Sequence, residues 1–286
     1  MWDSDGIRWE NDCARPWMDY RIFDLHTHVY PPRIAAKAVG ALNQFYSFVS
    51  ECEGTLTELL DVSRQSGVDG MAILGVATNA NQVEQVNEGV LRNASAARKE
   101  GYQAVAFIGM HQDYPYMSLE LRRAKMLGAK GIKIHPDIQR VDIDDPRLCK
   151  LYALAKDFDL PICLHMGDHR SDYRYSSPDK LVKVAKAFPQ VRFIAAHFGA
   201  YRAWEESDQL AKLPNVWFDT SSTLWALPTE RAMELIRLFG ADRFFFGTDY
   251  PVTTAEHELE RFWKLPLSEG ERRAILWDNA AKFLPL

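Results

Sequence analysis

An alternation of two patterns runs along this chain and constrains its fold more than any other feature. Short apolar runs recur, and a stretch with helical spacing follows each of them. The runs predict eight strands, at Tyr20–His28, Val68–Ala77, Tyr102–Met110, Ala129–Pro136, Leu160–Met166, Val191–Phe198, Asn215–Ser221 and Phe244–Asp249. The other stretches predict helices, at Thr55–Ser66, Asn81–Glu100, Met117–Leu127, Pro146–Phe158, Pro178–Phe188, Tyr201–Leu213, Thr229–Phe239, Thr254–Trp263 and Ser268–Phe283. The strands are almost continuously apolar, which is typical of a parallel sheet covered by helices on both faces.

Eight strand–helix units in a chain of 286 residues predict a (β/α)8 TIM barrel. A doubly wound open sheet is the alternative, but the sequence has neither a G-x-G-x-x-G motif after the first strand nor a P-loop. No linker of Pro, Gly or Ser interrupts the pattern, so we expect one domain, residues 20–286, after an N-terminal extension of residues 1–19. Residues 35–54 form an unusually long connection, and we expect them to carry a short helix over the barrel mouth.

The composition narrows the classes of partner. The chain has 34 basic and 39 acidic side chains and therefore no cationic excess with which to bind nucleic acid. Its uncharged stretches are too short to span a bilayer, and its first twenty residues are too acidic for a signal peptide. Its four cysteines form no C-x-x-C pair, which argues against a disulfide framework. We expect a cytoplasmic protein that acts on a small molecule. Trp2, Trp9 and Trp17 in the extension leave a homo-oligomer open.

The histidines gather at the ends of predicted strands. Six of the eight close a strand: His26, His28, His111, His135, His165 and His197. The eighth strand ends in Gly247-Thr248-Asp249. All strand carboxyl ends of a (β/α)8 barrel meet on one face, where active sites form, so we expect these residues to meet in space.

The first strand supplies the start of a metal site. His26 and His28 are two residues apart on a strand and should point the same way. Imidazole nitrogens together with a carboxylate suit Zn²⁺, and also Mn²⁺ or Fe²⁺. His165 is the natural third nitrogen ligand and Asp249 the oxygen ligand, which leaves a position for an activated water.

Two further residues have predicted roles beside the ion. His197 is the best-placed acid or base, and Asp249 is a second group that can take a proton from the metal-bound water. Asp24 is predicted to share the face of His26 and to be a buried hydrogen-bond partner of a ligand.

Several motifs resemble the amidohydrolase superfamily, and more narrowly its amidohydrolase-related group of TIM-barrel metal-dependent hydrolases. They occur in the family's order at Phe23–Pro31, Gly131–Pro136, Leu164-His165, Ala196–Gly199 and Phe246–Pro251, and the chain ends on a similar helix. The resemblance covers about residues 20–286. It implies metal ligation by His26, His28, His165 and Asp249, with His197 near the reaction centre.

Lys133 decides between two kinds of metal centre within this resemblance. In binuclear amidohydrolases a lysine of the fourth strand is carboxylated and bridges two ions, whereas the mononuclear group has no such bridge. We expect one ion, with the binuclear site as the alternative. Lys133 and His135 share a face and are predicted to contact substrate. Otherwise Lys133 is an interior cation paired with a carboxylate such as Asp24, and His135 contacts substrate or has a structural role.

The sequence leaves two reactions and two interpretations of the substrate-binding loop open. Arg170 or Arg174, in a polar loop after the fifth strand, could bind a substrate carboxylate, although a solvated loop with internal salt bridges explains both equally well. Hydrolysis of an amide, ester or lactone by a metal-activated water is the first expectation. Non-oxidative decarboxylation of an aromatic or unsaturated acid on the same site is the alternative. A non-catalytic protein on a decayed barrel would lack ligands, yet all the core positions are filled.

Overall fold

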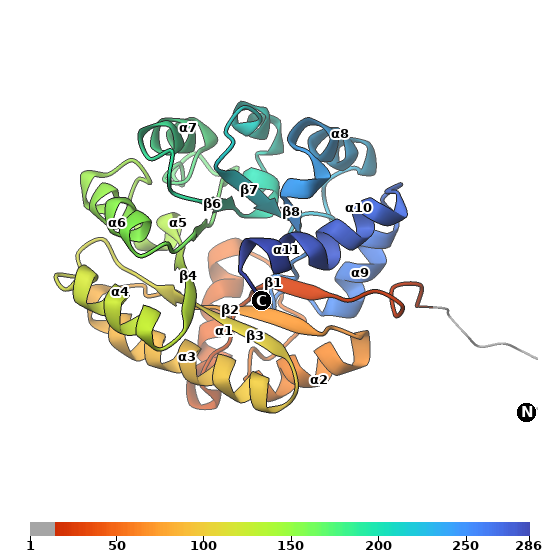
Figure 1. The fold of residues 1–286 in the computed structure, drawn as a ribbon, viewed down its shortest axis with the longest axis horizontal. Coiled ribbons are helices and arrows are strands. Elements are labelled where there is room, and N and C mark those ends of the chain that lie inside the picture. Colours follow the sequence, from red (N-terminus) through yellow and green to blue (C-terminus); the bar gives the residue numbers. More distant parts are fainter. Residues whose placement is uncertain (1–14) are drawn as a thin grey trace, which may run out of the picture.

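A computed structural model describes residues 15–286 of the protein as a sheet of eight parallel strands in sequence order (Figure 1). The strands are β1 (Phe23–Thr27), β2 (Gly70–Leu74), β3 (Gln103–Gly109), β4 (Ala129–Ile134), β5 (Ile162–Leu164), β6 (Phe193–Ala195), β7 (Val216–Asp219) and β8 (Phe244–Phe245). The ends of the sheet meet through a parallel bridge between Thr27 and Tyr250, and the Leu25 amide donates a hydrogen bond to Phe246 O at 2.9 Å. The sheet therefore closes on itself, and the predicted (β/α)8 barrel is confirmed.

Helices surround the barrel on its outside (Figure 1). The α-helices are α1 (Pro32–Tyr46), α2 (Leu56–Ser66), α3 (Val83–Lys99), α4 (Met117–Met126), α5 (Pro136–Gln139), α6 (Pro146–Asp157), α7 (Pro178–Ala187), α8 (Thr229–Phe239), α9 (Ala255–Trp263), α10 (Glu269–Arg273) and α11 (Asn279–Phe283). Short 3-10 helices lie at Ala80–Gln82, His197–Gly199, Trp204–Leu210 and Ala241–Arg243, and a π-helical turn at Ala274–Asp278 joins α10 to α11.

The helices differ from the sequence prediction at several places: α5 was not predicted, and the predicted helix Ser268–Phe283 is divided into α10, the π-helical turn and α11. The helix over the barrel mouth, α1, has 15 residues and is not short. The predicted helix at Tyr201–Leu213 is reduced to the 3-10 helix Trp204–Leu210, a stretch with too few apolar positions to form a helical stripe.

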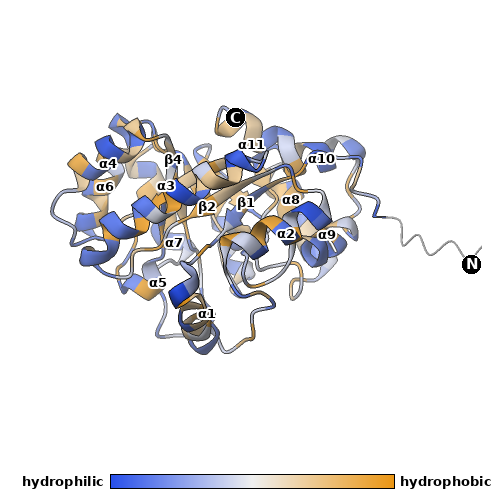
Figure 2. Ribbon diagram, turned by 90° about the horizontal axis from the view of Figure 1, so that it is seen from below, coloured by the Kyte–Doolittle hydropathy of each residue, from blue (hydrophilic) through white to orange (hydrophobic). Residues whose placement is uncertain are grey.

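The two ends of the barrel are filled differently. At the amino end, Phe23, Phe107 and Phe245 belong to a buried apolar cluster inside the barrel, and Phe283 of α11 packs on Phe245 at a ring distance of 5.1 Å. Figure 2 shows α11 and the carboxyl terminus at this end, and α1 at the opposite end of the molecule. The polar strand ends therefore face α1.

One tryptophan of the predicted extension lies within the described residues. Trp17 is buried and contacts Trp263 of α9 edge-on at 6.2 Å, so this part of the chain packs on the barrel. Trp2 and Trp9 lie outside the described residues. None of the helices between residues 15 and 286 combines the length and the apolar character needed to cross a bilayer.

Candidate metal and active site

A cavity of about 310 Å³ opens at the carboxyl end of the barrel, beside α1. Its polar wall contains seven residues predicted for the site: His26, His28, Lys133, His135, His165, His197 and Asp249. Its other wall is apolar and aromatic, and residues of α1 or just after it supply Leu42, Phe45, Tyr46 and Phe48. The strand-end rule thus brought distant residues to one place, as predicted.

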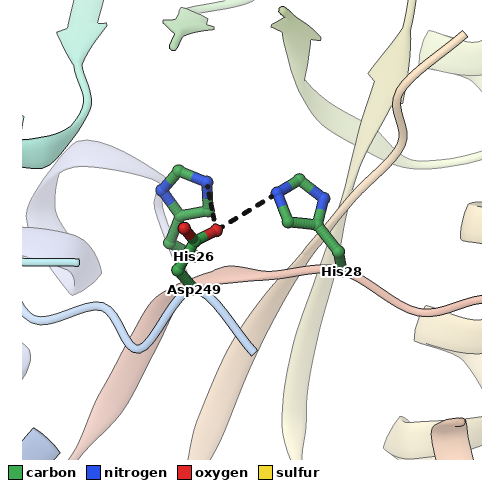
Figure 3. A group of neighbouring side chains, drawn as sticks. All are labelled: His26, His28 and Asp249. Atoms are coloured by element: carbon green, nitrogen blue, oxygen red, sulfur yellow. Dashed lines mark ion pairs between the residues drawn. The ribbon is translucent and has the colours of Figure 1, made fainter. Parts of the chain in front are cut away.

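Three of the four predicted metal ligands converge. His26 Nε2 and His28 Nε2 each lie 3.5 Å from Asp249 Oδ1 (Figure 3). Figure 3 shows both rings rising from β1 and the short stretch after it, with the carboxylate between them from the loop after β8. Two imidazole nitrogens and a carboxylate oxygen are a donor set that suits Zn²⁺, Mn²⁺ or Fe²⁺.

The outer atoms of this cluster are held by the barrel itself. His26 Nδ1 hydrogen-bonds to Asp219 Oδ2 of β7 at 2.8 Å. His28 Nδ1 donates to the carbonyl of Leu74 at 2.9 Å. Asp249 is fixed in the same way, because the Ser222 hydroxyl donates a hydrogen bond to its Oδ2 at 2.5 Å. With Nδ1 of both rings acting as donor, the lone pairs of Nε2 and Oδ1 face one another, as ligands for a cation require.

Burial also sets the charge of these groups. It lowers the pKa of His28 to about 3 and that of His26 well below its usual value, and the nearby Lys133 ammonium lowers both further. The rings are therefore neutral near pH 7, the form that binds a metal. Burial raises the pKa of Asp249 to about 7, against the opposing hydrogen bond from Ser222. A carboxylate that is costly to ionise in this setting gains from a cationic partner.

Lys133 lies fully inside the barrel and has no carboxylate partner among the described residues. Its Nζ lies 3.0 Å from His26 Nε2 and 3.8 Å from Cys163 Sγ. The alternative in which Lys133 pairs with Asp24 is therefore wrong. An unpaired ammonium is expensive to bury, so this amine is an unusual feature of the cavity floor.

Asp24 was predicted to share the face of His26, and the structure corrects this. The pairing of β1 with β2 shifts register between Asp24 and Thr27, so the alternation of sides is interrupted there. Asp24 is buried, but its Oδ1 accepts hydrogen bonds from the backbone amides of His26 and Thr248 at 3.1 and 3.0 Å. It holds two backbones in place, and Asp219 takes the predicted role of partner to a ligand ring.

His165, the fourth predicted ligand, lies in the same cavity but apart from the cluster of three. Its Nδ1 is 3.0 Å from His197 Nε2. His197 Nδ1 lies 3.1 Å from the carbonyl of Ser221 and must donate to it, so His197 Nε2 accepts a hydrogen bond from His165 Nδ1. The lone pair of His165 is then on Nε2, as in His26 and His28.

His135 has the opposite arrangement. Its Nδ1 accepts the backbone N–H of Ile138 at 3.4 Å, so a neutral ring carries its proton on Nε2. This ring stacks on His165 with a centroid distance of 4.1 Å, and Asp137 lies close enough for the three to form a second metal-capable group. The hydroxyl of Tyr46 lies between the two rings, 2.9 Å from His135 Nε2 and 3.1 Å from His165 Nε2.

The two arginines predicted to bind a substrate carboxylate do not line the cavity. Arg170 forms a bidentate pair with Asp168 at 2.9 and 2.6 Å, and its Nη1 donates to the carbonyl of Phe45 in α1 at 2.6 Å. Arg174 forms a bidentate pair with Glu206 at 2.6 and 2.9 Å. The loop has internal salt bridges, as the alternative interpretation expected, and Arg170 fastens α1 to the loop after β5.

Sequence reasoning missed four polar residues of the site: Tyr46, Asp219, Ser221 and Ser222. Asp219 closes β7 and obeys the same strand-end rule that found the histidines, so the signal was present. Ser221 Oγ donates to Asp219 Oδ1 at 2.5 Å and lies 2.9 Å from His197 Nδ1. Tyr46 had no such signal, because it belongs to a helix and not to a strand end.

A sequence profile of the amidohydrolase family matches residues 23–286. This chain belongs to the amidohydrolase family. The predicted resemblance is therefore confirmed.

Gamma-resorcylate decarboxylase of Polaromonas sp. strain JS666 is 27% identical over 124 residues, 43% of this chain and 33% of that protein. A second curated relative, an uncharacterized protein of Sinorhizobium fredii, is 28% identical over 130 residues, 38% of this chain and 44% of that protein. The matches thus span less than half the length of either relative.

Solved structures show the same fold. An uncharacterized TIM-barrel protein from Bordetella bronchiseptica has a TM-score of 0.73 at 21% identity, covering 93% of this chain and 98% of its own. A dihydroxybenzoic acid decarboxylase from Polaromonas sp. JS666, with bound manganese and the inhibitor 2-nitroresorcinol, has a TM-score of 0.70 at 16% identity, covering 93% and 97%. At these identities the likeness establishes the fold alone.

Proposed function

We propose that this protein is a metal-dependent carboxy-lyase that releases CO2 from a small hydroxylated aromatic acid. The observation that carries the proposal is the meeting of two surfaces in one cavity, the convergent cluster of His26, His28 and Asp249 and the aromatic wall beside α1. The relatives with assigned reactions support it, because the similar proteins include decarboxylases of resorcylate and dihydroxybenzoate. Hydrolysis, the first expectation from sequence, has no comparable support.

His26, His28 and Asp249 are the residues that would hold a divalent ion, and His165 presents a fourth lone pair to the same cavity. Their fit follows from the hydrogen bonds of their outer atoms, which leave the ligand atoms facing one another. A bound ion would supply Lewis-acid stabilisation of the negative charge that develops on the substrate. Zn²⁺ was the first expectation, but the donor set suits Mn²⁺ equally well.

The residues of the chain account for the remaining chemistry. In decarboxylation the bond between ring and carboxyl carbon breaks, its electron pair stays on the ring, and a proton replaces the departing CO2. We place Asp249 as the carboxyl group that passes this proton on, because it lies in the cavity wall beside the site of the ion. The apolar wall favours the departure of CO2. An ionised carboxylate is poorly solvated beside apolar side chains, whereas neutral CO2 has little solvation to lose there.

Lys133 is the one lysine or arginine among the described residues that line the cavity. A carboxylate entering the cavity therefore meets one cationic side chain, beside the residues that would hold the ion. We place Lys133 as the group that attracts the carboxylate toward the cluster, in keeping with its predicted contact to substrate.

The decisive experiment measures CO2 in sealed vials with metal-loaded protein and a panel of dihydroxybenzoates, beside acid release from a matched panel of esters, lactones and amides. We expect CO2 from at least one dihydroxybenzoate and no acid release from the second panel. Asp249→Asn should stop CO2 release, whereas Arg174→Lys, which alters a salt bridge away from the cavity, should not. Acid release without CO2 would replace the lyase by a hydrolase.

A further inference from the structure

A second cavity, of about 210 Å³, adjoins the cavity that holds the metal cluster. The two cavities share four wall residues: Phe48, Tyr201, Ser222 and Val252. Ser222 is also the residue that donates a hydrogen bond to Asp249, so the shared wall includes a direct neighbour of the cluster. Pockets that hold a whole ligand typically measure about 300–1,000 Å³, so the second cavity suits one part of a ligand whose other part lies in the first.

The residues that belong to the second cavity alone include two exposed apolar side chains. Val49, in the segment after α1, is 84% exposed, and Trp225, in the loop after β7, is 42% exposed. The Arg202 guanidinium lies 4.8 Å from the Trp225 ring and 5.8 Å from the Tyr201 ring, so one cation contacts both aromatic walls. Apolar side chains left exposed around a hollow are typical of a binding surface.

The polar groups of the second cavity are paired with one another. Thr253 Oγ1 donates a hydrogen bond to Glu51 Oε2 at 2.9 Å. Arg261 Nη1 lies 2.9 Å from Glu258 Oε2 and 3.3 Å from Thr253 Oγ1. Because these atoms are already engaged within the wall, a charged or polar occupant would gain little from them and would lose its own solvation. The occupant that gains most is apolar.

Backbone contacts hold the segment that carries Phe48 and Val49. On one side, the Ser50 amide donates to Asn43 Oδ1 of α1 at 3.0 Å. On the other side, the Glu51 amide donates to the carbonyl of Val252 at 3.1 Å. The second cavity is therefore formed before a ligand arrives, as small-molecule sites usually are.

We propose that the second cavity is a subsite for an aryl substituent of the substrate, which would make the substrate a hydroxylated aromatic acid with a second ring. The first ring lies in the cavity of the metal cluster, and the second ring packs on Trp225. A ring is favoured over an alkyl group because contacts between aromatic rings add to the gain from buried area. The acid itself rests on the proposed function, whereas the subsite is measured by binding and not by turnover.

The test compares the binding of 2-nitroresorcinol to metal-loaded protein with that of its 4-phenyl and 5-phenyl derivatives, which cover both kinds of free ring carbon. These ligands carry no carboxylate and cannot be decarboxylated. We expect at least one phenyl derivative to bind about ten-fold more tightly than the parent, and the cyclohexyl derivative at the same carbon to gain less. Trp225→Ala should remove most of this gain, and Trp225→Phe should retain most of it. Tyr116→Ala is the matched control, because Tyr116 is an exposed aromatic residue that lines neither cavity, and it should keep the whole gain.

A second variant guards against a fold defect in Trp225→Ala. Val49→Asp places a charge in the same cavity at a position that is almost fully solvent-exposed, and it should also remove the gain. Circular dichroism confirms that each variant is folded.

Four outcomes would overturn the inference, and they separate it from the proposed function. Binding of 2-nitroresorcinol with no gain from either phenyl group would contradict the subsite alone, as would a gain that survives both Trp225→Ala and Val49→Asp. An equal gain from phenyl and cyclohexyl would contradict the preference for a ring. If 2-nitroresorcinol does not bind at all, the proposed substrate class is wrong and the inference falls with it.

Discussion

The two sides of the cavity are built from the same kinds of side chain but are completed differently. On the side of β1 and β8, the barrel strands hold the outer atoms of His26, His28 and Asp249, and the inner atoms face one another. On the side of β4 and β5, the inner nitrogens of His135 and His165 are taken by a hydroxyl from α1. A rigid frame whose ligand atoms converge suits an ion, and its one competing contact among the described residues is that of Lys133 Nζ with His26 Nε2, whereas a hydroxyl from α1 already occupies the nitrogens of the other side.

The largest expected effect separates the two sides by metal content. Asp249→Asn removes the carboxylate on which His26 and His28 converge, so we expect the purified variant to lose the ion, about one per chain, that a mononuclear site would retain. His135→Asn, on the other side, should keep it. Plasma mass spectrometry of both variants, with folding followed by circular dichroism, makes the comparison. Wild-type metal content in Asp249→Asn would end the assignment of this side as the metal centre.

Substituting a residue that positions a ligand ring should also weaken metal binding, but by less than removing a ligand. Asp219→Asn weakens the hold on His26 Nδ1 without touching a ligand atom, and such changes typically cost 10- to 100-fold in metal affinity, so about that loss is expected. Asp137→Asn alters the buried carboxylate that lies 3.9 Å from His165 Nε2 on the other side, and it should leave the affinity unchanged. Competition with a chromophoric chelator measures both. Equal losses in the two variants would show that the sides act as one site.

The contrast between strand ends and the helix over the mouth also explains which site residues the sequence could predict. His26, His165 and Asp249 were found because strands are recognisable as apolar runs and their carboxyl ends must meet in a barrel. The side on which Asp24 lies was wrong, because a register shift in β1 leaves no mark in the residue pattern. Tyr46 was not predicted, since the position of a helix over the mouth depends on how its loops close. The sequence left Arg170 open between a substrate carboxylate and a salt bridge within the loop, although the carboxylate that binds it, Asp168, is only two residues away.

The packing behind the β1 and β8 side should also make stability depend on pH. Glu258 of α9 is fully buried, and burial together with the repulsion from Asp24 raises its pKa to about 8 from an ordinary 4.5. The folded state therefore keeps this proton to a higher pH than the unfolded chain. From this group alone, the free energy of unfolding falls as pH rises from about 4.5 to about 8, by up to about 1.4 kcal/mol per pH unit.

Glu258→Gln removes that titration. We expect urea unfolding of chelated protein to show that the free energy of unfolding of the variant rises relative to that of the wild type between pH 5 and pH 8. The reason is that only the wild type must ionise a buried carboxyl group. Glu234→Gln changes an exposed glutamate of α8 and serves as the control. A difference between Glu258→Gln and wild type that stays constant with pH would mean that Arg261 keeps Glu258 ionised throughout.

The smallest effect concerns the end of α1, which Arg170 ties to the loop after β5. Arg170 reaches the carbonyl of Phe45 while paired to Asp168, and its guanidinium stacks on Tyr173 at 4.0 Å. Lysine keeps the charge but loses the planar fork, so Arg170→Lys should release the end of α1 without unfolding the barrel. We expect amide hydrogen exchange around residues 44–50 to quicken a few-fold, since this opening is local. Arg174→Lys, whose partner Glu206 is remote from α1, should leave those amides unchanged. Unchanged exchange in both variants would show that packing alone holds Tyr46 in place, and the difference between the two sides would then lie in the histidine pair and not in the helix that covers it.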